Sequence, residues 1–133
     1  MVNKKSIPFG DGMGMKVAFC NAIAAEESSI KRQIWVSGQI AIDEKGTLVG
    51  KGDMAAQTEQ VIKNLQTALK EFDATLDDIV QVVVYVTDMS SLKSIHDVRL
   101  KYFNSPYPTS TLIQVSGFVN PDALIEISAI AVV

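Results

Sequence analysis

One segment, residues 79–87, constrains the fold more than any other part of the chain, because it is apolar on both faces of a strand. Successive side chains of a strand point to opposite sides. The valines at 82, 84 and 86 would therefore share one face, and Val83 and Tyr85 would share the other. A strand with two apolar faces needs a packed layer on each side. The rest of the chain must supply these layers or recruit them from another molecule.

Two amphipathic stripes, one before and one after this strand, predict two helices. Asp53 is placed to cap the first helix, and Lys70 suits the negative end of its dipole. Asn104, Pro106 and Pro108 end the second helix. The apolar positions repeat at helical spacing. They are Val61, Ile62, Leu65, Ala68, Leu69 and Phe72 in the first helix, and Leu92, Ile95, Val98 and Tyr102 in the second.

Four further apolar or β-branched segments predict strands, and Asp43–Gly46 has residues that are typical of a turn. We expect Trp35 to be a core residue. The predicted strands are 15–24, 33–42, 109–116 and 123–132, and the remaining core residues are Leu112, Ile113 and Val115.

The order strand, helix, strand occurs twice, which predicts right-handed crossovers onto a mixed sheet with both helices on one face. The fold class is therefore α+β. Nothing in the sequence covers the opposite face of the central strand. Packing of that face against copies of itself is the economical solution, so we expect an oligomer rather than a monomer.

Composition narrows the class of protein. The 133 residues fit one domain, 1–133, and the single cysteine, Cys20, agrees with a reducing compartment. We expect a cytoplasmic protein, because no secretory signal or bilayer-spanning apolar run is present. The net charge of −3, with dispersed basic residues, argues against nucleic acid. No zinc, nucleotide or dinucleotide motif is found, so we expect no cofactor and no metal. We also expect no membrane partner.

A series of short motifs runs through residues 16–133 in a fixed order. They are Ile34–Gln39 (I-W-V-S-G-Q), Ala56–Gln60 (A-Q-T-E-Q) with Asn64-Leu65, Leu76–Val80 (L-D-D-I-V), Val84–Met89 (V-Y-V-T-D-M), Tyr102-Phe103, Pro108 and Ile125–Ala131 (I-E-I-S-A-I-A). In this order they resemble the motifs of the Rid (reactive intermediate deaminase, YjgF-like) family, also labelled endoribonuclease L-PSP.

The resemblance implies a chorismate-mutase-like α+β fold, assembled as a homotrimer around a central barrel with a cleft between each pair of subunits. The best-studied members of the family hydrolyse enamines and imines, releasing ammonia and a 2-oxo acid without metal or cofactor. In them an arginine holds the substrate carboxylate. A backbone N–H after a Ser-Gly step, a tyrosine near the N-terminus and a glutamate of the last strand complete the site.

Three residues of this chain match the family site directly. Glu126 matches the glutamate and would position water and shuttle protons; its alternative is a solvated strand glutamate. Ser37 and Gly38 match the Ser-Gly step, whose backbone N–H groups could anchor a carboxylate or developing negative charge. The alternative for Gly38 is a bulge or a close packing contact.

The main departure from the family is Ser110, which stands where the resemblance places the arginine. A serine cannot make the bidentate contact that a guanidinium makes with a carboxylate. This favours a substrate without an α-carboxylate, unless Arg99, Lys16, Lys31 or Arg32 reaches the cleft from elsewhere.

Three more residues complete the predicted substrate-binding set. Phe19 replaces the family tyrosine and keeps the ring wall without the hydroxyl. Cys20 beside it is either a nucleophile or a small buried residue. His96, the only histidine, stands where relatives often carry asparagine. It is either an acid or base near the cleft or a residue at the edge of the helical stripe.

The resemblance therefore predicts a divergent enamine or imine deaminase whose small-molecule substrate binds in intersubunit clefts. The rival hypothesis is a non-enzymatic trimer that binds a small metabolite for regulation or protection. A ribonuclease or translation inhibitor is the third reading, and the acidic balance counts against it.

Overall fold

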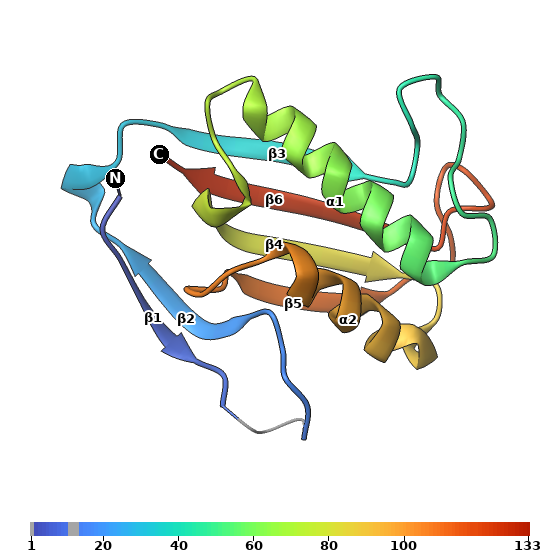
Figure 1. Ribbon diagram of the computed structural model, residues 1–133, viewed down its shortest axis with the longest axis horizontal. Coiled ribbons are helices and arrows are strands. Elements are labelled where there is room, and N and C mark those ends of the chain that lie inside the picture. The colour runs from blue at the N-terminus through green and yellow to red at the C-terminus, as the bar shows by residue number, and fades with distance from the viewer. Residues whose placement is uncertain (1, 11–13) are drawn as a thin grey trace.

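The computed structural model describes residues 2–10 and 14–133, which form strands and helices in two layers (Figure 1). The strands are β1 (Lys4–Pro8), β2 (Cys20–Ala25), β3 (Gln33–Gln39), β4 (Ile79–Val86), β5 (Thr109–Gln114) and β6 (Ile125–Val132). The helices are α1 (Met54–Lys70) and α2 (Leu92–Tyr102), with short 3-10 turns at Glu27–Ser29, Leu76–Asp78 and Met89–Ser91.

Four strands form a mixed sheet in the order β3-β6-β4-β5. β4 and β5 run parallel, as the crossover through α2 requires, and β6 pairs antiparallel with both β3 and β4. This confirms the expected α+β fold with both helices on one face of a mixed sheet (Figure 1). β1 and β2 form a separate antiparallel hairpin, joined to the start of β5 where the Cys20 N–H donates to the Pro108 carbonyl at 3.0 Å.

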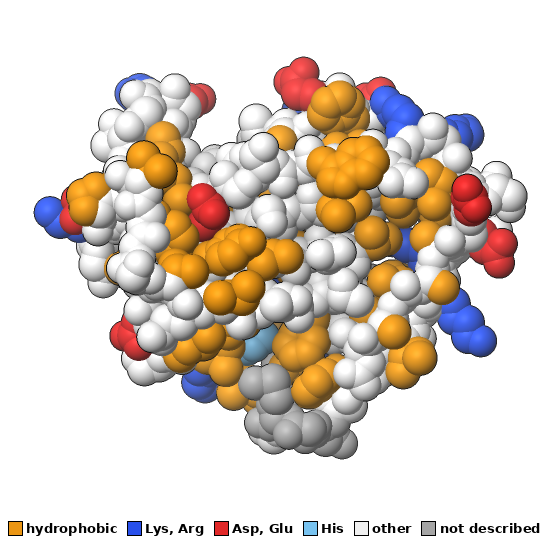
Figure 2. Space-filling model, turned by 180° about the vertical axis from the view of Figure 1, so that it is seen from behind, with side chains coloured by type: hydrophobic (Ala, Val, Ile, Leu, Met, Phe, Trp, Pro, Cys, Tyr) orange, Lys and Arg blue, Asp and Glu red, His pale blue; other side chains and the backbone are white. Residues whose placement is uncertain are grey.

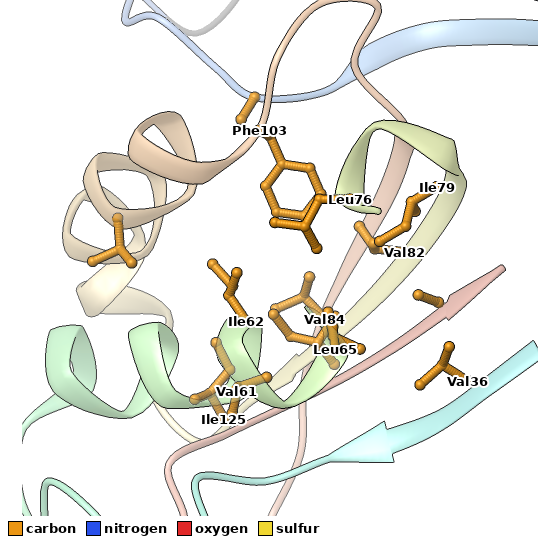
Figure 3. Packing of buried hydrophobic residues seen from close by; sticks show 14 of the residues in the cluster. Val36, Val61, Ile62, Leu65, Leu76, Ile79, Val82, Val84, Phe103 and Ile125 are labelled. Carbon is orange, nitrogen blue, oxygen red and sulfur yellow. The ribbon is translucent and has the colours of Figure 1, made fainter. Parts of the chain in front are cut away.

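The core lies between the helices and the sheet. Asp53 caps α1 as predicted, accepting from the Ala56 N–H at 3.1 Å. Figure 3 shows side chains of both layers meeting there. They include Val61, Ile62 and Leu65 from α1, Val82 and Val84 from β4, Ile125 from β6 and Phe103 after α2, all buried.

A buried glutamine ties α1 to the segment that leads into β6. The Gln57 side chain is fully buried and accepts from the Leu124 N–H at 2.8 Å. Its amide nitrogen donates to the carbonyls of Asp122 at 2.9 Å and Gly50 at 3.1 Å. Gln57 therefore fixes the start of β6, the strand that carries Glu126.

The other face of the sheet is not covered by any part of the chain that the structure describes. Trp35 is 68% exposed there, paired with Ile130 of β6. Val83 and Tyr85 of β4 point to the same side as Ser128 and Glu126, their partners in the register. Figure 2, seen from the side opposite the helices, shows apolar side chains grouped over the sheet. We call this surface the open face.

Several local predictions were wrong. Trp35 is not in the core, because its neighbours Ile34 and Val36 take the buried side of β3. Phe72 lies beyond the end of α1 and is 47% exposed. The strand predicted over 15–24 begins only at Cys20, and β1 was not predicted at all. Among the described residues, no helix is long and apolar enough to cross a bilayer.

Candidate functional site

Glu126 lies against the backbone of Gly38. It is the second residue of β6, half-buried on the open face and opposite Tyr85 of β4. A Cβ added to Gly38 would lie 2.6 Å from the Glu126 carboxyl carbon and 2.8 Å from Oε2. No side chain fits at position 38 unless this carboxylate moves. A close packing contact therefore explains the glycine, and this is one of the interpretations of Gly38 that the sequence allowed.

The Ser37–Gly38 step is a bulge in the β3 edge strand. The pairing of β3 with β6 shifts between Val36 and Gln39, so that the step lies outside the regular ladder. A bulge re-aims backbone groups and leaves its extra residue unpaired. Ser37 and Gly38 are both exposed. The Glu126 carboxylate and an irregular, solvent-facing piece of backbone are therefore adjacent.

A second group of predicted residues meets elsewhere, in a cavity of about 110 Å³ between α2 and β5. Phe19, His96 and Ser110 line it together. The remaining lining residues are Leu92, Ile95, Arg99 and Leu112. Ile95, His96 and Arg99 are buried, whereas Phe19, Ser110 and Leu112 are half-buried. The buried side chains of α2 thus form the floor of the cavity.

Arg99 is the unexpected member of this group. Its side chain is buried, with 2% of the residue exposed, and its Nη2 donates to the Ala18 carbonyl at a long 3.4 Å. The guanidinium carbon lies 6.0 Å from the centre of the Phe103 ring. Within the described residues, no acidic side chain forms a salt bridge with it. Burial lowers the pKa of Arg99 to about 10, so the side chain remains a cation at neutral pH.

His96 is buried beside this cation. Its Nδ1 atom has no hydrogen-bond partner in the described part of the chain, and its ring centre is 5.7 Å from that of Phe19. Burial lowers the pKa of His96, the charge of Arg99 lowers it further, and Asp97 opposes both. The imidazole is therefore neutral near pH 7.

Cys20 does not belong to the cavity. It is buried at the start of β2 and lines a different, larger hollow with Phe19 and Lys16. Burial raises the pKa of its thiol, against smaller opposing hydrogen bonds from backbone groups. A thiol that keeps its proton is a poor nucleophile. The structure thus favours the reading of Cys20 as a small buried residue.

The two groups do not meet within one chain. Glu126 lies on the open face, whereas Ser110 pairs with the buried Val82 and faces the helices. Two inter-strand steps separate β6 from β5 across β4. A single site containing both groups would have to form between molecules. No cluster of three or more His, Cys, Asp or Glu side chains suited to a metal is found among the described residues.

The sequence indicates Arg99 only as one of four basic residues that could replace the missing arginine. A stronger signal was available in the sequence. Position 99 lies four residues after Ile95 and seven after Leu92, so it falls on the apolar stripe of α2. A charged residue at a core-facing helical position is uncommon and marks a buried cation.

The profile of a family described as Endoribonuclease L-PSP matches residues 18–133. This chain belongs to the Rid/YjgF (L-PSP) family. A RutC family protein of Pyrococcus abyssi is 39% identical over 98 residues, which cover 74% of this chain and 76% of that protein. A 3-aminoacrylate deaminase, RutC, of Acinetobacter baylyi is 35% identical over 98 residues, 74% of this chain and 77% of that protein.

The fold agrees with a solved structure of the same family. A Rid family protein of unknown function from Yersinia pestis superposes with a TM-score of 0.80 and 28% sequence identity. The match covers 98% of this chain and 99% of that one. Family membership supports enamine or imine deamination as a general class of activity, and the L-PSP name leaves the other readings open.

Proposed function

We propose that this chain is a deaminase that hydrolyses a small enamine or imine in a cleft shared between two copies. The observation that carries the proposal is the Glu126 carboxylate, packed on the Ser37–Gly38 bulge at the edge of an uncovered apolar face. A carboxylate beside irregular backbone can hold a water and receive its proton. The name of the Acinetobacter relative, a 3-aminoacrylate deaminase, supports the same reaction class.

The chemistry needs only water and proton transfer. An enamine first takes a proton on carbon and becomes an iminium ion, the protonated form of the imine. Glu126 orients a water for attack on the C=N carbon and accepts a proton as the C–O bond forms. It then returns that proton to the nitrogen of the carbinolamine, the C–N bond breaks as the hydroxyl group gives its proton to Glu126 or water, and ammonia and a carbonyl compound leave. Backbone N–H groups of the Ser37–Gly38 bulge would hold a polar group of the substrate.

The cleft itself is part of the proposal. The exposed Trp35 lies at one edge of the open face, and the two apolar strands β6 and β4 lie next to it in the sheet. Three subunits around a central barrel would bury the open face against one another. This packing would bring Glu126 of one subunit towards the cavity of the next. The Phe19, His96 and Ser110 side chains would then form the wall opposite Glu126.

The experiment is ammonia release from freshly generated 2-aminoacrylate and 3-aminoacrylate. Wild-type protein is expected to accelerate release above the spontaneous rate. Glu126→Gln is expected to lose roughly a hundredfold or more of that acceleration, the usual scale for a positioned acid or base. Glu27→Gln is the matched control, because Glu27 is an exposed glutamate in the turn at Glu27–Ser29. Spontaneous-rate release in wild type would contradict the proposal.

A binding protein without turnover is the second candidate, and Ser110 is the observation that favours it. A cavity that lacks the family arginine at this position could retain a ligand without activating it. That reading is supported if wild-type protein binds a small acid but releases ammonia from neither substrate. A ribonuclease is disfavoured by the net charge of −3.

A further inference from the structure

The cavity between α2 and β5 is built around a cation that no described acid neutralises. Arg99 forms its floor and is 2% exposed, and among the described residues its side chain has one hydrogen bond, of 3.4 Å to the Ala18 carbonyl. A guanidinium has five N–H donors, and a buried cation is unfavourable unless it is paired. The arrangement is therefore incomplete without a negative partner.

A second buried polar group points to the same missing partner. His96 lines the cavity, is 4% exposed, and leaves Nδ1 without a hydrogen bond among the described residues. Buried polar atoms are nearly always hydrogen-bonded, so an unpartnered one in a cavity indicates a ligand or water. Arg99 and His96 lie three residues apart on α2 and present their donors to one space.

The size and walls of the cavity limit the partner. A volume of about 110 Å³ is well below the roughly 300–1,000 Å³ of sites for drug-sized ligands. Phe19, Leu92, Ile95 and Leu112 make the remaining wall apolar, apart from the Ser110 hydroxyl. Such a space accepts the charged end of a small organic acid and excludes a nucleotide.

We propose that this cavity binds the carboxylate of a small organic acid and that Arg99, reaching in from α2, is the residue that anchors it. Ser110 leaves open the space that an arginine at its position would fill. This inference rests on the proposed function for the reaction, and it specifies the substrate as an enamine or imine that carries a carboxylate. It replaces the sequence-based expectation of a substrate without one.

Binding is measurable without turnover, because the chain has one histidine and that histidine lines the cavity. Pyruvate serves as the probe, and its uncharged methyl ester as the comparison. The His96 ring signals in an NMR titration are expected to shift saturably with pyruvate and not with methyl pyruvate. Equal response to both compounds, or no response to pyruvate, would overturn the proposal.

Variants then test whether Arg99 is the anchor. Arg99→Met is expected to weaken pyruvate binding on the order of tenfold to a hundredfold, the scale of a lost charge-assisted hydrogen-bonded pair. Arg99→Lys should retain part of the affinity because it keeps the charge. Arg32→Met is the matched control, since Arg32 is the other arginine and also bonds a backbone carbonyl, that of Phe72, at 2.8 Å. Unchanged affinity in Arg99→Met would overturn the proposal.

Thermal unfolding separates an anchor from a structural arginine. Pyruvate should raise the melting temperature of wild type and Arg32→Met but not of Arg99→Met. Without ligand, Arg99→Met should melt no lower than wild type, because it removes an unpaired buried cation. A large loss of ligand-free stability, with the pyruvate effect retained, would show that Arg99 is structural and overturn the proposal.

The two proposals fail in different ways. Pyruvate binding that depends on Arg99, without ammonia release from either enamine, would leave the anion site standing and remove the deaminase. Ammonia release by wild type, with kcat/KM unchanged in Arg99→Met, would leave the deaminase standing and remove the role of Arg99.

Discussion

Gly38 is the residue whose lack of a side chain leaves room for the Glu126 carboxylate. An added Cβ would lie 2.6 Å from the Glu126 carboxyl carbon. Because the contact is with the end of a flexible side chain, Gly38→Ala should lower the free energy of unfolding by about 1 kcal/mol or less. The displaced carboxylate should cut ammonia release by roughly tenfold or more.

Gly117→Ala is the matched control for this change, because an added Cβ there meets nothing within 4 Å. Denaturation by urea and ammonia release, measured on the same preparations, check both parts of the prediction. Full activity in Gly38→Ala would show that the position of the Glu126 side chain does not matter to the reaction.

His96 gives a prediction about pH at the same scale. Its pKa should lie below the ordinary 6.5 in ligand-free protein, because burial and Arg99 disfavour the imidazolium. Since the unfolded chain then binds the proton more readily, this residue reduces stability as pH falls below 6.5. NMR titration of the single histidine measures the pKa directly.

Two variants test the causes of this shift in the pKa of His96. Asp97→Asn should lower the pKa further, because Asp97 raises it, and Arg99→Met should raise it. The other groups of the cavity, Phe19 and Ser110, carry no charge. A wild-type pKa at or above 6.5 would contradict the arrangement described here.

The residues of the site were only partly predictable. Glu126, Ser37 and Gly38 could be located by their motifs, and the structure brings them together. Phe19, His96 and Ser110 also meet, but on the other side of the sheet. That separation depends on which face of its strand each side chain takes, and the motifs that locate these residues do not relate the faces of β5 and β6 to one another.

At the scale of elements, α1 holds the strand that carries Glu126 through one side chain. Gln57→Met would leave the Leu124 N–H and the Asp122 carbonyl without their partner, whereas the Gly50 carbonyl would keep the Asp53 N–H at 2.9 Å. Unpaired buried polar groups are costly, so the free energy of unfolding should fall by roughly 2–4 kcal/mol. Denaturation by urea measures the change.

Gln66→Met is the matched control for Gln57→Met, since Gln66 is an exposed glutamine of the same helix. Its effect should stay within about 0.5 kcal/mol. A similar small effect in Gln57→Met would mean that water replaces its hydrogen bonds and that α1 does not hold the start of β6.

Periodicity predicted the long elements well and the short ones poorly. Both helices and the Asp53 cap are confirmed, with Phe72 the exception in the first stripe, as is the apolar strand at 79–87. β1 escaped prediction because Lys4–Pro8 contains two lysines and a proline, and it is formed by pairing with β2 rather than by burial. Local pattern carries little information about such a hairpin.

At the scale of the whole molecule, the open face is the feature that the sequence predicted from Val83 and Tyr85. Ile130→Glu would place a charge in the middle of that face, beside Trp35 in the register. If copies bury this face, the charge should dissociate them, because an unpaired buried carboxylate is costly. Light scattering on a sizing column measures the mass.

Val119→Glu is the matched control for Ile130→Glu, since Val119 is an apolar residue fully exposed outside the sheet. It should leave the oligomer intact. A monomeric wild type at micromolar concentration would contradict the shared cleft, and so would an oligomer that Ile130→Glu leaves unchanged.

The most direct test of the shared cleft is to mix two impaired variants, each of which lacks one side of it. Glu126→Gln lacks the carboxylate of the open face, and Arg99→Met lacks the cation of the cavity. When the two chains are unfolded together and refolded as mixed oligomers, about a quarter of the clefts combine an intact Glu126 with an intact Arg99 from neighbouring subunits. Ammonia release should therefore recover to about a quarter of the wild-type rate. A mixture no more active than its two parents would contradict a site built from two subunits.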